Sequence, residues 1–459
     1  MSSGFDLLVH GGSVVTRDGV RRADLGVADG RIVAVAPELE GPAGRMLDAT
    51  GLHVFPGILD AHVHFNEPGR TAWEGLATGS AALAAGGGTW FSDMPLNSLP
   101  AVLDAASFLE KRRLAERKSV TDFSLWGGLV PGNLDRIGEL RDAGAIGLKS
   151  FMCDSGIDDF PAVTDAAVLR AGMKRAATLG VLVALHAEDN ELTRKLTGNA
   201  RARGKTDALS WLASRPVEVE LAAIRLATEL AGETGCALHV VHVSSPEGLE
   251  VITRARRSGV DVTAETCPHY LLLDEEAVTR LGAVAKCAPP LRSGERRREL
   301  WRSLASGAVD TIGSDHSPAP PELKQAEDFF AIWGGISGVQ HGFPLLLGEA
   351  CVGASGQAAL APFAGMLAAN VADRFRLACK GSLAVGFDAD FTLLDLHAPH
   401  ILTNEDLLYR HRQGPYAGRR CQIRVVQTFV RGRPVWREGR IVEDAHPGRF
   451  VPPESLAKA

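Results

Sequence analysis

The stretch Asp60-Ala61-His62-Val63-His64 ends an apolar run that begins at Val54. A run of this kind is typical of a buried β-strand, and on a strand residues i and i+2 point to the same face. The two histidines therefore direct their imidazoles to one point, as metal ligands do. A pair of partly buried histidines at a strand end is the simpler interpretation, and the other strand ends of the chain must distinguish the two.

Short apolar strands alternate with longer Ala- and Leu-rich helical segments from Phe55 onward, which is the pattern of a parallel α/β sheet. Eight such strands are expected, near 54–60, 88–93, 122–129, 145–151, 181–187, 237–243, 260–266 and 309–315. Eight βα units predict a TIM (β/α)8 barrel. A doubly wound sheet would carry a glycine-rich phosphate loop after its first strand, and this sequence has none.

Both ends of the chain carry short β segments. Residues 5 to 54 read as strands separated by turns, and strand signals return in 380–383, 386–394 and 423–430. The strands at either end of the chain are too few to bury the apolar face of a sheet by themselves. We therefore expect the two ends to form one small β-sandwich beside the barrel. The expected division is 1–54 and 379–459 for the sandwich, and 55–378 for the barrel.

The bulk composition of the 459 residues is that of an ordinary globular protein, with 45% hydrophobic and 23% charged residues. A net charge of −6 gives no reason to expect a nucleic-acid partner. No secretory signal or membrane-spanning run is visible, so we expect a cytoplasmic protein that does not bind membranes. The seven cysteines are scattered and include no C-x-x-C pair, which indicates reduced thiols.

Polar residues recur where the predicted barrel strands end, and the active site of a TIM barrel lies at that end. These residues are His62, His64, Lys149, His186, His242 and Asp315. Singly, His186 or His242 would be interpreted as a hydrogen-bonded core histidine. Together, four imidazoles and a carboxylate in one pocket would be costly to bury without a cation. They exceed the ligands of one tetrahedral ion, so two divalent metals fit better.

Lys149 does not fit this set as an ordinary lysine, because an ammonium group is repelled by metal ions and has no lone pair to donate. It could be a surface lysine that extends from a strand end. A carbamate, formed when carbon dioxide carboxylates the amine, would instead be anionic and long enough to bridge two metals. Burial and nearby cations lower the pKa of the amine, which favours the neutral form that reacts.

Six stretches carry a resemblance to a known family over nearly the whole chain. They are FPGILDAHVHFNEPGR (55–70), DMPLNS (93–98), GLKSF (147–151), HVVHVSSPEG (239–248), ETCPHY (265–270) and SDHSP (314–318). With these motifs the sequence resembles the cyclic amidohydrolases of the amidohydrolase superfamily, and among them the allantoinases.

The resemblance implies a binuclear centre held by the six strand-end residues, usually with zinc and with cobalt or manganese as alternatives. It further implies that Lys149 is an N6-carboxylysine that bridges the metals. Asp315 would be both a ligand and the catalytic base, and the substrate would be allantoin. The relatives are usually homotetramers.

Asn66 bears on the choice of substrate. Dihydroorotases carry an arginine two residues after the second histidine, where it pairs with a substrate carboxylate; here that position is Asn66. A neutral amide cannot make that charge pair but can bond to a ureido group. The alternative for Asn66 is a loop residue in an Asx turn. Hydantoinase, dihydropyrimidinase and dihydroorotase activities stay open, as does a non-catalytic scaffold protein, although scaffolds typically lack several of the six ligands.

Weaker substrate-binding candidates follow from the same resemblance. Asn97 matches a substrate-contacting asparagine, Cys287 lies where relatives contact substrate through the main chain, and Ser317 follows Asp315 closely. Each has a structural alternative: a turn residue, a buried thiol and a capping hydroxyl, respectively. Structural roles are favoured for Cys267 and His269, and Glu188 and His316 are candidates to orient the ligands.

Overall fold

A ring of parallel strands forms the centre of the computed structural model, which describes residues 4–352, 356–442 and 448–454. The strands are β8 (Ile58–Val63), β9 (Gly88–Asp93), β10 (Asp122–Leu125), β11 (Gly127–Gly128), β12 (Leu148–Phe151), β13 (Val183–His186), β14 (Leu238–Val240), β15 (Val262–Thr266) and β16 (Thr311–Ile312). They pair in sequence order and in parallel. All eight predicted barrel strands have a counterpart, with the third one divided into β10 and β11. The first starts later than expected: of the predicted 54–60, residues 54–56 belong to the sandwich strand β7 (His53–Pro56), and the barrel strand begins at Ile58.

The strands form a closed ring. β10 and β11 are two parts of one strand joined through Trp126, whose amide donates to the carbonyl of Asp93 at the end of β9 at 3.1 Å. Between the last and first strands, the amide of His64 donates to the carbonyl of His316 at 2.8 Å, beside a parallel bridge from Val63 to His316. The predicted TIM barrel is confirmed, and this closure places the two ends that carry His64 and Asp315 side by side.

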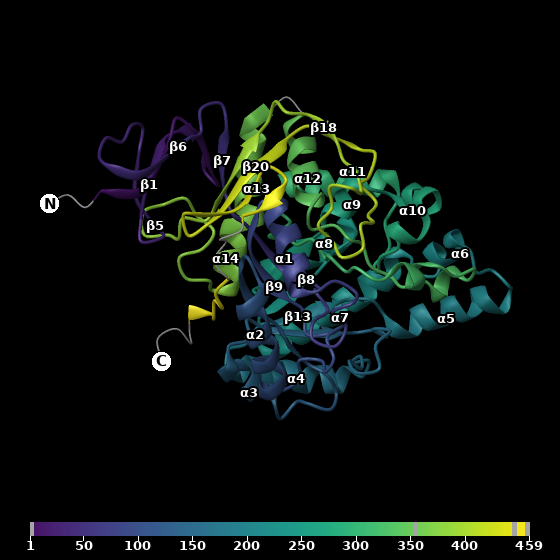
Figure 1. The fold of residues 1–459 in the computed structure, drawn as a ribbon. Coiled ribbons are helices and arrows are strands. Elements are labelled where there is room, and N and C mark those ends of the chain that lie inside the picture. The colour runs from purple at the N-terminus through teal and green to yellow at the C-terminus, as the bar shows by residue number, and fades with distance from the viewer. Residues whose placement is uncertain (1–3, 353–355, 443–447, 455–459) are drawn as a thin grey trace.

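Helices surround the barrel, each returning the chain to the next strand (Figure 1). Those that follow successive strands are α1 (Leu76–Ala85), α2 (Ala105–Lys118), α3 (Ile137–Ala143), α4 (Ala166–Leu179), α7 (Val217–Thr234), α8 (Pro246–Arg257) and α11 (Gly294–Ala305). Further helices lie between them and at the C-terminal side: α5 (Asn190–Ala202), α6 (Ala208–Ala213), α9 (Pro268–Leu272), α10 (Glu275–Leu281), α12 (Gly342–Cys351), α13 (Leu360–Ala364) and α14 (Asn370–Phe375). None of the helices among the described residues is long and apolar enough to cross a membrane.

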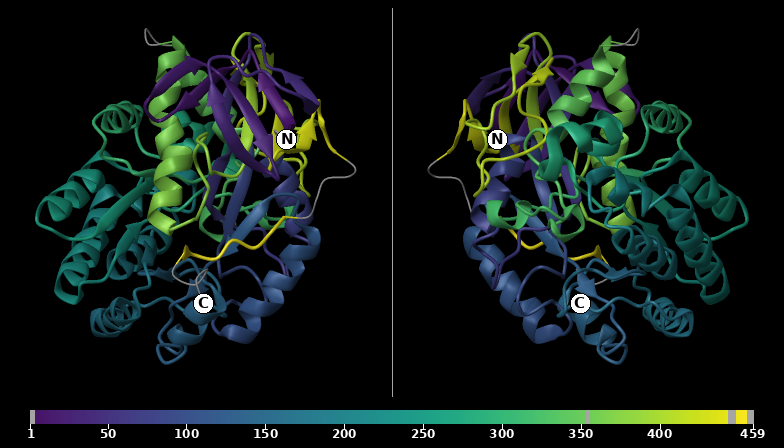
Figure 2. Two further views of the ribbon diagram at one scale, coloured as in Figure 1. Left: turned by 90° about the vertical axis from the view of Figure 1, so that its left-hand side faces the viewer. Right: turned by 90° about the vertical axis from the view of Figure 1, so that its right-hand side faces the viewer.

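The sandwich consists of two sheets built from both ends of the chain. One has the order β5-β4-β1-β6, with β1 (Phe5–His10), β4 (Asp24–Ala28), β5 (Arg31–Ala36) and β6 (Ala43–Asp48). The other has the order β22-β21-β20-β17-β7-β2-β3, with β2 (Ser13–Thr16), β3 (Gly19–Arg22), β7 (His53–Pro56), β17 (Phe391–Asp395), β20 (Arg424–Val430), β21 (Arg433–Arg437) and β22 (Arg440–Ile441). Figure 2 shows the early and late strands together, as the sequence predicts. Phe391 and Phe429 stack in their core at 4.4 Å.

Two C-terminal segments differ from the expectation. Residues 380–383 do not form a strand, and Lys380 is instead buried among acidic side chains. The segment 448–452 leaves the sandwich and lies along barrel strand β10, where Phe123 bonds to Arg449 and Val451 through the main chain at 2.9 and 2.8 Å. The C-terminal part of the chain therefore supports the barrel as well as the sandwich. A small ribbon of β18 (His400–Ile401) and β19 (Arg420–Cys421) is separate from both sheets.

A buried ion cluster joins the barrel to the sandwich. Lys380 Nζ lies 2.6 Å from Asp122 on β10, 2.6 Å from Asp390 and 2.9 Å from Asp388. Arg431 also pairs with Asp122. Burial opposes the charge on the ammonium, but Asp390 and Asp122 outweigh it and raise the pKa of Lys380 above its usual range. The loop that follows α14 is thus held by charge rather than by a β ladder.

Replacing Lys380 with methionine is expected to lower the free energy of unfolding by about 3–5 kcal/mol, because buried carboxylates would lose their main counter-ion. Chemical denaturation followed by circular dichroism measures the change, with the exposed Lys174→Met as the matched control. A Lys380→Met protein as stable as the control would show that the cluster contributes nothing to joining the two parts.

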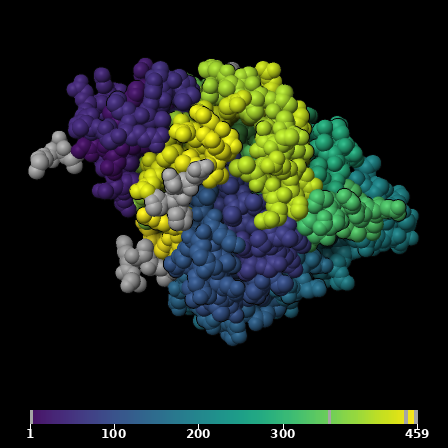
Figure 3. Space-filling model, viewed as in Figure 1, coloured from purple at the N-terminus to yellow at the C-terminus, as the bar shows by residue number. Residues whose placement is uncertain are grey.

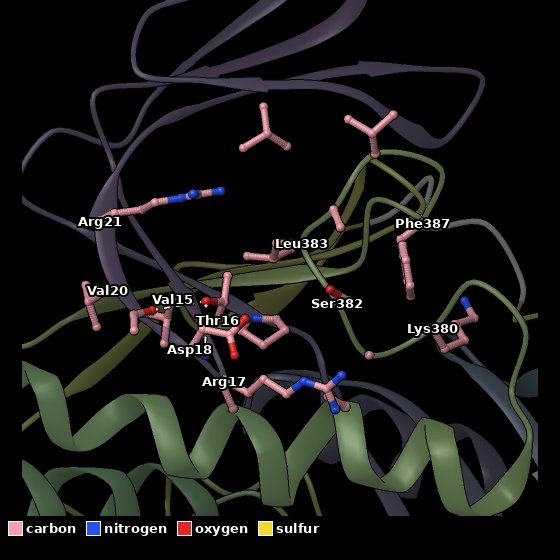
Figure 4. A pocket seen from close by; sticks show the side chains of 18 of the residues that line it. Val15, Thr16, Arg17, Asp18, Val20, Arg21, Lys380, Ser382, Leu383 and Phe387 are labelled. Atoms are coloured by element: carbon pink, nitrogen blue, oxygen red, sulfur yellow. Dashed lines mark hydrogen bonds between the residues drawn. The ribbon is translucent and has the colours of Figure 1, made fainter.

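A hollow of about 640 Å³ lies between the sandwich and the barrel (Figure 4). The β2–β3 hairpin forms one wall and residues 380–387 form another. Its charged side chains Arg17 and Asp373 are paired with each other at 3.1 Å. In the space-filling view the N-terminal β segments and the C-terminal strands form one continuous surface above the barrel (Figure 3).

Candidate metal centre at the barrel mouth

All six predicted ligands line one cavity of about 450 Å³ at the carboxyl ends of the strands. His62 lies on β8 and His64 just beyond it, Lys149 is on β12 and His186 ends β13. His242 and Asp315 follow β14 and β16 by two and three residues. Parallel strands deliver these side chains to one place because their carboxyl ends share one face of the barrel. The structure thus brings together six side chains that are spread over more than 250 positions of the sequence.

The first part of the centre consists of His62, His64 and Asp315. Asp315 Oδ1 lies 3.3 Å from Nε2 of His62 and 3.4 Å from Nε2 of His64. On its other side, Nδ1 of His62 lies 2.7 Å from Glu265. The imidazoles of His62 and His239 outweigh burial and lower the pKa of Glu265 to about 2, so it can only accept. Nδ1 of His62 therefore carries the proton, and its Nε2 lone pair faces the carboxylate of Asp315.

Two acceptor atoms at this distance repel each other unless a proton or cation lies between them. Burial lowers the pKa of His64, which favours the neutral ring that metals bind. Burial would raise the pKa of Asp315, but His62, His64 and His242 keep it well below its usual range. Neutral imidazoles and an ionised carboxylate are the protonation states that a divalent metal requires.

The second part consists of His186 and His242, whose Nδ1 and Nε2 atoms lie 3.0 Å apart. Nε2 of His186 donates to Glu188 at 2.9 Å, which leaves the Nδ1 lone pair directed at His242. Arg215 in turn pairs with Glu188 at 2.6 Å, and its charge outweighs burial so that the pKa of Glu188 is lowered to about 2. Burial also lowers the pKa of His242 well below its usual value. This pair repeats the arrangement of the first: a buried carboxylate orients a histidine whose other nitrogen is free to bind.

Lys149 lies within the same cavity with no counter-ion in contact. Its side chain is fully buried and, within the part of the chain that the structure describes, Nζ has no hydrogen-bond partner. Burial lowers its pKa to about 8, although Asp315 and Glu265 oppose the shift. A buried amine without an acceptor is unfavourable as it stands. Conversion to a carbamate would replace it with two oxygens among the neighbouring ligands.

The backbone is strained where the ligands are presented. His242 has φ 41° and Asp315 has φ 45°, in the left-handed region that residues with a β-carbon seldom adopt. Asn66 and Asn97, on the loops beside the cavity, have φ 63° and 66°. Strain of this kind persists only where the surrounding structure enforces it, and it clusters at functional sites.

The donor set therefore fits a pair of divalent ions. His62, His64 and Asp315 can hold one ion, His186 and His242 can contribute to a second, and a carboxylated Lys149 would supply one oxygen to each. The orphaned Lys149 Nζ and the approach of the Asp315 carboxylate to Nε2 of His62 are the observations that favour this arrangement.

The substrate-binding candidates divide into two groups. Asn97 and Ser317 line the cavity, and Asn97 Nδ2 approaches Nδ1 of His64 at 3.4 Å. Asn66 and Cys287 are not among the lining residues. The Asn66 amide donates instead to the carbonyl of Pro318 at 3.2 Å, and the Cys287 thiol to the carbonyl of Pro289 at 3.3 Å. For Asn66 the positive φ gives a conformational reason for its presence, because asparagine tolerates this region better than most residues.

Sequence reasoning missed Glu265 as the partner of His62, although its place at the end of β15 was a usable signal. It also missed cavity residues supplied by loops. Arg215 precedes α7, Trp211 lies on α6, and Lys286 and Trp333 lie in irregular segments. No periodic pattern marks such residues, so only the folded chain reveals them.

The comparison with protein families matches residues 53–435 to the model of the amidohydrolase family. The chain belongs to the amidohydrolase family. Curated relatives in this family include an allantoinase of Deinococcus radiodurans, 51% identical over 98% of this chain and 99% of its own length. An allantoinase of Rubrobacter xylanophilus is 50% identical over 98% of each chain.

Among solved structures, the L-hydantoinase (dihydropyrimidinase) of Arthrobacter aurescens superposes on this amidohydrolase with a TM-score of 0.93. It is 34% identical, and the match covers 98% of this chain and 100% of that one. The cyclic amidohydrolase resemblance predicted from the motifs is confirmed. A barrel that carries a sandwich built from both chain ends is thus the architecture expected of a hydrolase of cyclic amides.

Proposed function

We propose that this amidohydrolase is an allantoinase, which hydrolyses the hydantoin-ring amide of allantoin to give allantoate. The observation that carries the assignment is the near full-length identity of 50–51% to relatives named allantoinase. The geometry supports the same chemistry, since the six residues predicted as metal ligands lie together in one cavity.

We infer that the cofactors are two divalent ions. The histidine and carboxylate donors suit zinc, with cobalt or manganese as substitutes. Carbon dioxide would be needed as well, to carboxylate Lys149. When bound, the ions supply Lewis acidity that activates both a water molecule and the ring carbonyl.

The chain's own residues would then move the proton and hold the substrate. Asp315 accepts the proton of the attacking water and delivers it to the leaving ring nitrogen, as general base and then general acid. Glu265 and Glu188 keep the ligand histidines His62 and His186 in the required tautomer. Asn97 and Ser317 lie where they can hydrogen-bond to the ring or to the ureido arm.

A substrate panel tests the proposal directly. With the zinc-loaded enzyme, allantoin is expected to have a higher kcat/KM than hydantoin, dihydrouracil or dihydroorotate, and cobalt- and manganese-loaded enzyme should keep that order. Dihydroorotate is expected to be the poorest, because no arginine stands at position 66 to pair with its carboxylate. Faster turnover of dihydrouracil than of allantoin would contradict the assignment.

A hydantoinase is the second candidate, favoured by the solved L-hydantoinase with a TM-score of 0.93. The same panel decides between the two. A non-catalytic scaffold would be recognised by purification without stoichiometric metal. Cytoplasmic location and assembly as a homotetramer stay predictions from the sequence.

A further inference from the structure

One wall of the cavity is a single irregular segment. Residues 330–335 line the cavity consecutively, and they supply both aromatic and glycine surfaces to it. The segment begins in the short 3-10 helix Phe329–Ala331 and has no strand or α-helix to fix the rest. Trp333 packs edge-on against Trp73 at 4.9 Å, which is its main aromatic contact. Something other than regular secondary structure must therefore hold the main chain of this wall.

Main-chain hydrogen bonds hold the segment at three points: the amide of Phe329 donates to the carbonyl of Thr206, that of Trp333 to Leu323 and that of Gly335 to Lys286, at 2.8–2.9 Å. Two lysine side chains add to these bonds. Lys286 Nζ donates to the carbonyls of Phe329 at 2.7 Å and Phe330 at 3.4 Å, and also to that of Ile332. Lys324 Nζ donates to the carbonyls of Trp333 at 3.0 Å and Gly335 at 2.7 Å. Five carbonyls of the segment thus accept from two ammonium groups. Burial lowers the pKa of both lysines to about 7. The neighbours of each Nζ named here are carbonyl acceptors, which bind the charged form, and in that form the contacts are strong restraints on a short segment.

Each lysine also has other contacts: Lys286 Nζ lies over the rings of Trp211 and Phe329 at 5.2 and 5.3 Å, and Lys324 Nζ approaches the carbonyl of Ala283 at 3.4 Å. Among the described residues neither forms an ion pair with a carboxylate; Asp328, the acidic residue at the start of the segment, pairs with Arg201 at 2.9 Å instead. Lys286 is only 4% exposed. Burying a cation without a counter-ion is costly unless its donors are satisfied, and here main-chain carbonyls satisfy them. Burial of these two side chains is unfavourable by itself, and it occurs beside the substrate cavity, where it fixes the main chain of the wall.

We propose that Lys286 and Lys324 are positioning residues, which hold segment 329–335 as the wall that selects the substrate. The proposal rests on the allantoinase function above and deepens it. It predicts that loss of either lysine weakens substrate binding and selectivity, while the metal centre and the proton transfer by Asp315 continue. Lys324 gives the cleaner test, because it does not line the cavity whereas Lys286 does.

The kinetic test compares Lys324→Met and Lys286→Met with the wild-type holoenzyme. For Lys324→Met, KM for allantoin is expected to rise about tenfold, which is the effect of losing roughly one strong hydrogen bond. The kcat and the metal content should stay close to those of the wild type, and the preference for allantoin over hydantoin should fall. Lys324→Arg keeps a charged donor and is expected to retain most of the affinity. The exposed Lys174→Met is the control for loss of a lysine elsewhere.

Hydrogen exchange measured by mass spectrometry tests the wall without using activity. Amides of 329–335 are expected to exchange faster in both methionine variants, with unchanged exchange in the barrel strands. Unchanged exchange in this segment, or faster exchange with unchanged KM and selectivity, would overturn the proposal. If the wild type does not hydrolyse allantoin, the proposed function fails, and the exchange result still decides whether the lysines hold the wall.

Discussion

Asp315→Asn is expected to lower kcat for allantoin by about 10²–10⁴-fold, the usual contribution of a positioned acid or base. The amide keeps the shape of the side chain and one oxygen for a metal, but it cannot accept the proton of the attacking water. Steady-state kinetics and metal analysis by mass spectrometry, performed on the same preparation, measure the effect. Much of the metal should stay bound, since the histidines at the site are unchanged.

The matched control for this variant is Asp135→Asn, an exposed aspartate that does not line the cavity. It removes the same charge and should have wild-type kinetics. An Asp315→Asn enzyme with full activity would end the assignment of Asp315 as the proton carrier. Loss of both metals together with the activity would instead show that Asp315 acts mainly as a ligand.

Lys149→Met is expected to lower the metal content from two ions per chain to one or fewer and to reduce kcat/KM by about 10³-fold or more, as for loss of a metal that activates water. Methionine has a similar length and fits a buried site, so the barrel should fold. Metal analysis and kinetics measure both effects. Lys149→Arg is the useful comparison, because it restores a cation and cannot form the carbamate.

The wild-type protein offers a complementary test of carboxylation. Metal-free enzyme reconstituted with zinc in buffer depleted of carbon dioxide should recover little activity, and added bicarbonate should restore it over time. Intact-mass measurement under native conditions should then show the added carboxyl group. Full recovery of activity without carbon dioxide would exclude the carbamate as a required ligand.

The barrel and its ligands could be predicted because the information is local and repeated. Each strand is a short apolar run, and each ligand lies within three residues of the end of such a run, so parallel pairing alone brings His62, His186 and Asp315 together. Glu188, two residues after His186, could be proposed from the sequence as a residue that orients a ligand. The partner of His62 could not, because the distance from Glu265 to its ring is set by the closure of the barrel.

Asn66 and Lys380 show why the remaining expectations differed. The identity of Asn66 suggested a substrate contact. In the structure it has a φ of 63° and donates to the carbonyl of Pro318. This loop geometry could not be predicted from the neighbouring residues. At 380–383 the sequence suggested a strand, but Lys380 is surrounded by three carboxylates, one from far along the chain and two from the turn that follows. Long-range charge pairing overrides a weak local propensity.

The order of strands in the seven-stranded sheet has a consequence for synthesis on the ribosome. β17 lies between β7 and β20, so β7 has an unpaired edge until β17 has been synthesised, when most of the chain has left the ribosome. The barrel strands pair in sequence order and can assemble before that. A chain truncated before β17 would thus keep every metal ligand, yet expose the edge of β7 to other nascent chains, and its main failure would be aggregation rather than loss of chemistry.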